Sequence, residues 1–370
     1  MTFVVQRQPA PTAAPVHVLI VMVGNYLDKS ANLQGAATFA QAIVDFWRTL
    51  PVSSFPSAQA LVSIEVLASD SSGAVSIVGD NGPVGVDRPT FDAAKTALLG
   101  WARRVKAEGG IGFLHWVGHG MEQIKGGSIV SLACDGARDD GAGQAGLDWT
   151  CTLHVINGMT DGQPVYCFID ACRSPDRSDL GFEGIGPPNW SAGDNACVFF
   201  STARGKKAFW IVTPKPAALN AGCGKHALGT QAFIAALKGF GARLPDDPAA
   251  IQVPIVAAEL VQASQALVAR WARHQQISPP PGDPAGPSGR RPDAILLTDE
   301  PKCTVDVFAK GVASPTDCEA LAGSPPPLAS ETASVPFEFR LARKPHKFRF
   351  NSQNWDPEKL LLHPHMELYK

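Results

Sequence analysis

Charged residues are scarce in this chain of 370 residues: they make up 18% of it, and the formal net charge is only −2. Such a chain has no global basic field that would attract nucleic acid or an anionic membrane. The longest apolar run near the N-terminus, residues 16–23, is too short to span a bilayer, and the residues before it have no secretory layout. The eight cysteines form no CxxC pair, which favours reduced thiols over disulfides. We therefore expect a cytoplasmic protein without a membrane span.

Hydrophobic residues, at 45% of the chain, are numerous enough for a large core. Short apolar runs alternate with amphipathic segments through the first two thirds of the chain. The expected strands are residues 16–23, 64–68, 111–117, 165–169 and 197–200, with a small edge hairpin at 128–133. The expected helices are residues 33–50, 90–106, 148–159, 230–240 and 253–275. This alternation predicts an α/β fold, in which a mostly parallel sheet of about six strands carries helices on both faces.

The ends of the chain differ from this pattern in composition. We expect a flexible N-terminus at residues 1–15, a main domain at 16–310, a linker at 311–335 and a separate tail at 336–370. Residues 278–292 form a Pro/Gly-rich insertion, and residues 294–297 and 304–308 are candidate late strands. The tail interleaves basic and aromatic residues, which are Arg340, Arg343, Lys344, Lys347, Phe348, Arg349 and Phe350. A solvated or packed tail is favoured over a nucleic-acid contact.

Two apolar runs end in reactive residues. Residues 113–120 read FLHWVGHG and place His119 between two glycines, and residues 165–174 read VYCFIDACRS and place Cys172 two residues after Asp170. Ligands of open α/β sheets bind beyond the carboxyl ends of the strands, and adjacent strands lie ~4.8 Å apart. An imidazole there can activate a thiol. The N–H groups of Gly120 and Cys172 are the candidate oxyanion hole.

Each of these residues also has a structural interpretation. A lone buried cysteine is usually a small hydrophobic residue, and a lone histidine at a strand end is usually structural. The separation between the two residues, 172 − 119 = 53 positions, together with the order of the elements, favours the catalytic interpretation. His115 and His119 lie about 13 Å apart if both are on one strand, which is too far for a shared metal ion.

The segment Asp170-Ala171-Cys172-Arg173-Ser174 resembles the motif of caspases, which carry their histidine about 50 residues upstream of the cysteine. The chain resembles the group of caspases, metacaspases and paracaspases, and it is closer to bacterial and metacaspase-like members than to animal caspases. Weaker similarities lie at residues 25–36, 200–205 and 229–237, and the resemblance covers about residues 16–275, or 310 at the most. It implies a caspase-like three-layer sandwich with a large-subunit-like part at 16–174, a linker at 175–194 and a small-subunit-like part at 195–310.

The resemblance implies a cysteine endopeptidase with Cys172 as the nucleophile and His119 as the proton shuttle. It assigns Asp170 to the S1 pocket, and it assigns the substrate groove to Ser201, Thr202, Ala203, Arg204 and Gly205. The linker contains Arg177 as a candidate autocleavage site. The implied partner is a protein substrate, for example a pore-forming or toxin-like protein activated in bacterial defence or regulated cell death. The alternative is a catalytically silent homologue that acts as a scaffold or regulator.

The P1 preference stays open between two classes. Animal caspases cut after Asp by means of an arginine whose position falls here around Phe209-Trp210, where no arginine stands. Metacaspases cut after Arg or Lys by means of two acids; Asp170 matches the first, and the second falls near Phe39. We therefore expect a basic or a neutral apolar P1 residue rather than Asp.

No cofactor is expected. Several metacaspases need calcium, and Asp135, Asp139, Asp140 and Asp179 are weak candidates for calcium ligands, because carboxylate oxygens in glycine-rich loops suit Ca²⁺. A solvated acidic loop is the favoured interpretation of these residues.

Overall fold

The computed structural model describes residues 2–8, 12–56, 59–123, 129–134, 146–173, 175–176, 196–216, 223–242, 252–277, 285–288, 295–298, 302–308, 317–321, 327–332, 337–342, 345–350, 353–360 and 365–369. The chain divides into two compact units. The first comprises Met1–Pro214, Gly224–Gln231 and Ser278–Pro292, and the second comprises Lys215–Cys223, Ala232–Ile277 and Asp293–Lys370.

A seven-stranded sheet forms the centre of the first unit, in the order β1-β3-β2-β6-β10-β12-β16. Its strands are β1 (Phe3–Gln6), β2 (Ala14–Val23), β3 (Gln59–Ser69), β6 (Ile111–Val117), β10 (Val165–Asp170), β12 (Ala196–Phe200) and β16 (Ala285–Ser288). The five inner strands are parallel, and the two outer strands, β1 and β16, are antiparallel to their neighbours. The predicted mostly parallel α/β sheet is confirmed.

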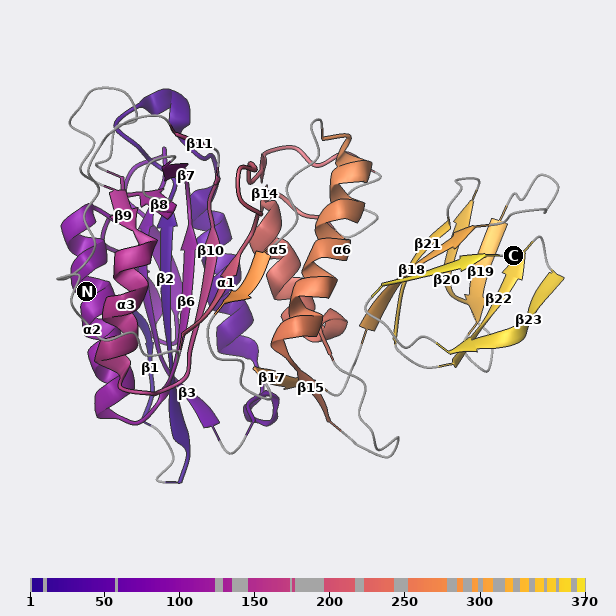
Figure 1. The fold of residues 1–370 in the computed structure, drawn as a ribbon, viewed down its shortest axis with the longest axis horizontal. Coiled ribbons are helices and arrows are strands. Elements are labelled where there is room, and N and C mark those ends of the chain that lie inside the picture. The colour runs from indigo at the N-terminus through magenta and orange to yellow at the C-terminus, as the bar shows by residue number, and fades with distance from the viewer. Residues whose placement is uncertain are drawn as a thin grey trace. The chain divides into compact units, whose positions relative to one another are not determined.

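Helices cover both faces of this sheet (Figure 1). One face packs against α2 (Phe91–Ala107) and α3 (Trp149–Thr160), and the other packs against α1 (Ala36–Thr49). The inner strands are apolar on both sides because both faces are covered. Two helices begin as their sequences predict: the side chains of Thr90 and Asp148 accept hydrogen bonds from Ala93 N–H and Thr150 N–H.

Rings from neighbouring strands stack on the α1 face of the sheet. Trp47 of α1 donates through Nε1 to Nε2 of the buried His115, at 2.9 Å. The His115 ring stacks on Phe168, which stacks on Phe199, with centroid separations of 4.9 and 5.0 Å. Cross-strand aromatic pairs of this kind fix the register of β6, β10 and β12. The register matters because it decides which residues leave the sheet side by side at its carboxyl edge.

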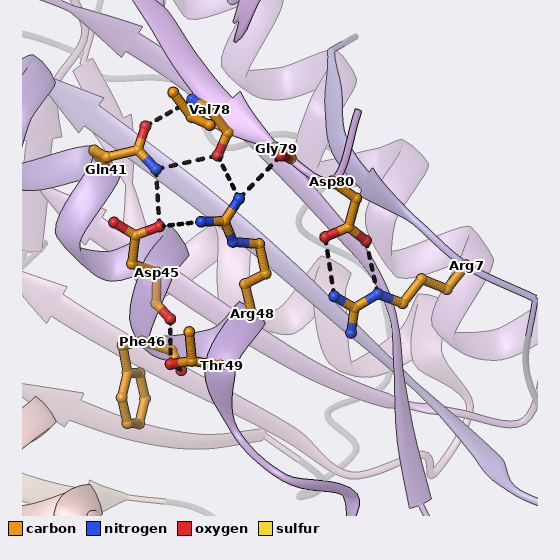
Figure 2. Close-up of polar contacts among 9 residues, drawn as sticks. All are labelled: Arg7, Gln41, Asp45, Phe46, Arg48, Thr49, Val78, Gly79 and Asp80. Atoms are coloured by element: carbon orange, nitrogen blue, oxygen red, sulfur yellow. Dashed lines mark hydrogen bonds and ion pairs between the residues drawn. The ribbon is translucent and has the colours of Figure 1, made fainter. Parts of the chain in front are cut away.

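The outer side of α1 is tied to the hairpin of β4 (Ser76–Gly79) and β5 (Gly82–Gly85). The Gln41 side chain pairs with both the N–H and the carbonyl of Val78, as Figure 2 shows. Arg48 donates to the Val78 and Gly79 carbonyls and to Asp45 (Figure 2). These bonds satisfy an edge that would otherwise be open.

An ion pair ties the N-terminal segment to the same region. Arg7 donates from Nε to Asp80 at 2.7 Å (Figure 2). The sequence analysis expected a flexible segment at residues 1–15, and the structure places β1 within it. The Phe3–Gln6 strand was not expected because four residues give too short a pattern to separate a strand from a loop.

Short elements complete the first unit. A four-stranded sheet has the order β11-β7-β8-β9, and β13 pairs with β14. These strands are β7 (Gly120–Gln123), β8 (Ile129–Leu132), β9 (Gly146–Asp148), β11 (Pro175–Asp176), β13 (Trp210–Ile211) and β14 (His226–Ala227). Two short 3₁₀ helices are η1 (Lys29–Ala31) and η2 (Val52–Ser54). Residues 129–132, where the sequence analysis expected a small edge hairpin, form the single strand β8, which pairs with β7 and β9.

The second unit contains the long helix α6 (Ala257–Gln275) and the short η3 (Ala236–Phe240), which continues α5 (Leu228–Ala235). The helix predicted over 253–275 begins late, because Pro254 lacks a backbone N–H and Val253–Ile255 forms β15, paired with β17 (Leu296–Thr298). Within the described residues, no helix combines the length and the apolar character needed to cross a membrane.

The C-terminal region is built of strands. They are β18 (Lys302–Phe308), β19 (Asp317–Leu321), β20 (Pro327–Thr332), β21 (Phe337–Ala342), β22 (Pro345–Phe350), β23 (Gln353–Leu360) and β24 (His365–Tyr369). They form one sheet in the order β21-β18-β24 and another in the order β20-β19-β22-β23. The sequence analysis expected a late strand at 304–308, where β18 lies, and a linker and a tail after residue 310. The expectation of a linker and a tail was based on composition and did not use the alternation of apolar and polar residues, as in FEFRLA at 337–342. Such alternation is typical of a strand.

Candidate active site

A cavity lies beyond the carboxyl ends of β6 and β10, within the first unit. The residues that line it are Leu33, Val117, Gly118, His119, Asp170, Cys172, Ala208, Phe209, Trp210 and Ala227. Val117 and Asp170 are partners in the β6–β10 register, so the two strands leave the sheet together. The structure therefore brings His119, which stands 172 − 119 = 53 positions before Cys172, to the same cavity as Asp170 and Cys172. The cavity lies at the edge where α/β sheets bind ligands.

The His119 ring is held by a backbone carbonyl. Its Nε2 lies 2.7 Å from the carbonyl oxygen of Ala31 in η1. A carbonyl can only accept, so Nε2 carries the hydrogen, and Nδ1 keeps the lone pair in the neutral ring. This tautomer gives the ring a basic nitrogen that can take a proton from a thiol.

Tyr26 positions the backbone of the same histidine. Its hydroxyl accepts from the N–H of His119 at 2.7 Å and donates to the Val23 carbonyl at 3.0 Å. The Tyr26 ring lies against the imidazole with a centroid separation of 4.9 Å. Burial raises the pKa of Tyr26 well above its ordinary value, so the phenol stays neutral and can accept and donate at once. A Cβ at residue 118 would lie 2.7 Å from this hydroxyl, which explains why Gly118 precedes the histidine.

Gly120 lets the chain after His119 pack on the nucleophile loop. A Cβ there would lie 2.7 Å from Cβ of Ala171 and 2.9 Å from the carbonyl oxygen of Cys172. In the β7–β8 ladder, Leu132 N–H bonds to the His119 carbonyl, so Gly120 faces Ser131 in a non-hydrogen-bonded pair. The N–H of Gly120 consequently points away from β8, as an oxyanion donor would require.

Cys172 follows β10 by two residues and is partly buried. Its Sγ lies 3.6 Å from the carbonyl oxygen of Ala208, toward which it donates. The Arg173 N–H donates to the Lys206 carbonyl at 2.9 Å, and the Arg173 carbonyl accepts from Gly205 at 3.0 Å. Residues 205–208 therefore run directly beside the candidate nucleophile.

Asp170 lines the cavity and is bound from behind by α5. Its Oδ2 accepts from the N–H and the Oγ1 of Thr230, at 2.5 and 2.8 Å. Gly229 permits this approach, because a Cβ there would lie 3.0 Å from Oδ2. Burial raises the pKa of Asp170 above its ordinary value, although the interactions with Ser201 and Thr230 act in the opposite direction. Its carboxylate is thus both a wall of the cavity and a cap of a helix.

Glu122 links the histidine loop to the cysteine loop. It lies on β7, on the same face as Gly120, and the residue is 5% exposed. Oε1 pairs with Arg204 Nε at 2.5 Å, and Oε2 lies 3.4 Å from Arg173 Nη2. The Arg173 guanidinium also lies over the Phe200 ring, 4.8 Å from its centroid. Two arginines thus compensate one buried acid beside Cys172.

An aromatic wall closes another side of the cavity. Trp210 donates through Nε1 to the Gln34 carbonyl at 3.0 Å and contacts Phe39 edge-on. The His226 ring lies 5.1 Å from Trp210 and 5.3 Å from Phe39, between centroids. The sequence analysis placed Phe39 and Phe209-Trp210 near the pocket only through the resemblance. It assigned the groove to Ser201, Thr202, Ala203, Arg204 and Gly205, none of which is among the described residues that line the cavity.

The part of the chain that the structure describes has no group of three His, Cys, Asp or Glu residues arranged for a metal ion. The calcium candidates Asp135, Asp139, Asp140 and Asp179 lie outside the described residues, as does Arg177.

No protein-family model matches this chain, and no curated protein matches it. It is similar to the solved structure of caspase-1 from Spodoptera frugiperda, with 14% sequence identity, a TM-score of 0.39, and coverage of 76% of this chain and 92% of that chain. A likeness this distant establishes neither the family nor the function. The fold and the site define an α/β protein that presents a thiol and an imidazole at the carboxyl edge of a parallel sheet.

Proposed function

We propose that this chain is a cysteine endopeptidase in which Cys172 is the nucleophile and His119 is the proton shuttle. The observation that carries the proposal is the cavity that both residues line, with the imidazole anchored through Nε2. A thiol and an imidazole with one basic ring nitrogen are the two groups that acyl transfer to sulfur requires.

In the proposed reaction, the Cys172 sulfur attacks the carbonyl carbon of the scissile peptide bond, and the thiol proton passes to Nδ1 of His119. The tetrahedral oxyanion accepts hydrogen bonds from the N–H groups of Gly120 and Cys172. The C–N bond then breaks, and the imidazolium gives its proton to the leaving amine. Water, deprotonated by His119, attacks the acyl-enzyme, and the C–S bond breaks to release the acid and restore the thiol.

We assign the cavity to a neutral apolar P1 side chain. Most of its wall is apolar, and one oxygen of its acid, Asp170, is already bound twice by Thr230. A P1 Arg or Lys, which the resemblance also allows, would have to bind the remaining oxygen. Cleavage of peptides that differ only at P1 (Leu, Arg or Asp) separates the three classes.

The resemblance to caspases and metacaspases is the support for a protein partner as substrate. A pore-forming or toxin-like protein, activated by cleavage in bacterial defence or cell death, is the partner that this resemblance suggests. This part of the proposal is tested by incubating lysate proteins with the wild type or with Cys172→Ala and sequencing the new N-termini. We expect new N-termini with the wild type that are missing with Cys172→Ala.

An acyloxymethyl-ketone probe for cysteine peptidases tests the activity itself. We expect covalent labelling of the wild type, none of Cys172→Ala, and full labelling of Cys151→Ala. Cys151 is the matched control because it is also partly exposed but lies on α3. A folded wild-type protein that neither labels nor cleaves peptides would overturn the proposal and favour a catalytically silent scaffold or regulator.

A further inference from the structure

The exposed loops that border the cavity are rich in cations, although the whole chain carries a formal net charge of −2. The basic rim, as we name this set, consists of Lys29, Arg204, Lys206, Lys207 and Lys225, all of them exposed. Charges gathered around a cleft act on a ligand together, because the low-dielectric walls focus their field.

Two lysines of the basic rim lie directly beside the candidate nucleophile. The Lys206 carbonyl accepts from the N–H of Arg173 at 2.9 Å. Ala208, two residues further on, lines the cavity, and its carbonyl lies 3.6 Å from Sγ of Cys172. The backbone of residues 206–208 is therefore held next to the thiol by one bond from the Arg173 N–H and one from Cys172 Sγ.

The other lysines approach the cavity from different loops. Lys225 precedes β14, in which Ala227 pairs with Trp210 and lines the cavity. Lys29 begins η1, whose last residue is Ala31, the carbonyl partner of His119. The Lys29 ammonium donates to Asn25 Oδ1 and to the Tyr26 carbonyl, which are neutral acceptors, so its charge is not cancelled.

Few acids in the described part of these loops offset this charge. Glu122 is shared by Arg204 and Arg173, so that group keeps an excess positive charge. Asp170 is buried and caps α5. Asp28 is exposed, and its carboxylate accepts from the N–H and the hydroxyl of Ser30. Among the described side chains of these loops, four exposed lysines thus stand against one exposed aspartate.

We infer that the basic rim selects substrates in which acidic residues flank the scissile bond, outside the P1 position. Such a peptide would place Asp or Glu side chains against Lys206 and Lys207 while a neutral P1 side chain enters the apolar cavity. The inference rests on the proposed peptidase function, and it adds a substrate class, an acidic peptide segment, that the cavity alone does not define. Electrostatic steering of this kind raises the association rate and weakens with salt.

The test compares two fluorogenic peptides with the same neutral P1 residue, one flanked by Glu and one by Gln on both sides. We expect the wild type to cleave the Glu peptide with about a five-fold higher kcat/KM at low salt, and this preference to shrink at high ionic strength. The double variant Lys206→Gln/Lys207→Gln should lose most of the preference for the Glu peptide over the Gln peptide. The control Lys95→Gln/Arg103→Gln removes the same charge from α2 and should keep the preference.

Binding to Cys172→Ala, followed by fluorescence anisotropy of the same peptides, separates charge recognition from catalysis. Tighter binding of the Glu peptide, lost in Cys172→Ala/Lys206→Gln/Lys207→Gln, supports the inference even if cleavage is slow. Equal binding and equal cleavage of the two peptides by an active wild type would overturn the inference and leave the peptidase function standing. If neither peptide binds and neither is cleaved, both proposals fail.

Discussion

His119 donates through Nε2 to the carbonyl oxygen of Ala31, 2.7 Å away. Because the acceptor belongs to the backbone, the tautomer of the catalytic candidate depends on the path of residues 25–32 rather than on a side-chain acceptor. That path is itself fixed, since the Tyr26 N–H donates to Asn32 Oδ1 at 2.8 Å. The imidazole is thus oriented by the loop after β2 before any substrate binds.

Tyr26→Phe removes the hydroxyl that joins His119 N–H to the Val23 carbonyl, and it keeps the ring. We expect kcat on a peptide substrate to fall about ten-fold, because the histidine loses its backbone anchor, while KM changes little. Thermal unfolding should show a loss of about 1–3 kcal/mol, since two buried groups lose their partner. Tyr166→Phe, in another buried tyrosine, is the control for stability. An unchanged kcat in Tyr26→Phe would contradict the positioning role.

Gly118→Ala and Gly120→Ala should both destabilise the protein, because their Cβ atoms would meet heavy atoms 2.7 Å away. For Gly120 two of the neighbours are backbone carbonyls, of Val130 and Cys172, which cannot rotate aside. We expect a loss of about 1–3 kcal/mol for Gly120→Ala and a smaller one for Gly118→Ala. Gly85→Ala adds its methyl group to open space and serves as the control. Equal melting temperatures in all three variants would contradict the close packing of the two loops.

The long strands and the two reactive residues could be predicted from sequence because their signals are local. Residues 111–117 and 165–169 are continuous apolar runs ended by polar or glycine residues, and the structure has β6 and β10 there. A parallel sheet places the carboxyl ends of both strands at the same edge. The structure agrees, because His119 and Cys172 line one cavity there.

What sequence could not predict depends on tertiary contacts with no local signal. The acceptor for His119 is the backbone carbonyl of Ala31. Every residue type has such a carbonyl, so the residue at position 31 gives no sign of this bond in the sequence. The strand β16 lies within a Pro/Gly-rich segment, residues 278–292, whose composition predicts irregular structure. Residues 208–210 become a cavity wall only because the Arg173 backbone bonds to Lys206 and Gly205. In each case a backbone hydrogen bond between distant segments decides the outcome.

Asp170→Asn distinguishes the two P1 classes that the sequence left open. If P1 is neutral, as we propose, kcat/KM on a Leu peptide should change less than about three-fold, because Asn can still accept from Thr230 through its Oδ1. A basic P1 residue would instead depend on the carboxylate, and kcat/KM on an Arg peptide should then fall by about 100-fold, as when a buried charge loses its partner. Efficient wild-type cleavage after Arg together with that loss would refute a neutral P1. Asp161→Asn, which removes a carboxylate at the C-terminal end of α3 and outside the residues that line the cavity, is the control.

His115 makes stability depend on pH in a predictable direction. Burial lowers its pKa from 6.5 to about 3, so the folded state holds a neutral ring where the unfolded chain binds a proton. The stability that comes from the neutral ring is complete above the unfolded pKa, and it is lost as the pH falls from there toward the folded pKa. The expected slope from this one group is about 1.4 kcal/mol per pH unit.

His115→Gln isolates this contribution, because its amide oxygen can still accept from Trp47 Nε1. We expect the variant to be less stable than the wild type at pH 7 and to lose less stability between pH 6 and 5, as measured by urea unfolding at each pH. The difference between the two slopes should approach the value for one proton. Phe168→Leu disturbs the same ring stack without a titratable group, so its stability should run parallel to that of the wild type. If the free energy of unfolding of His115→Gln also ran parallel to that of the wild type, His115 would not gain a proton on unfolding. That result would contradict a buried neutral ring in the folded state.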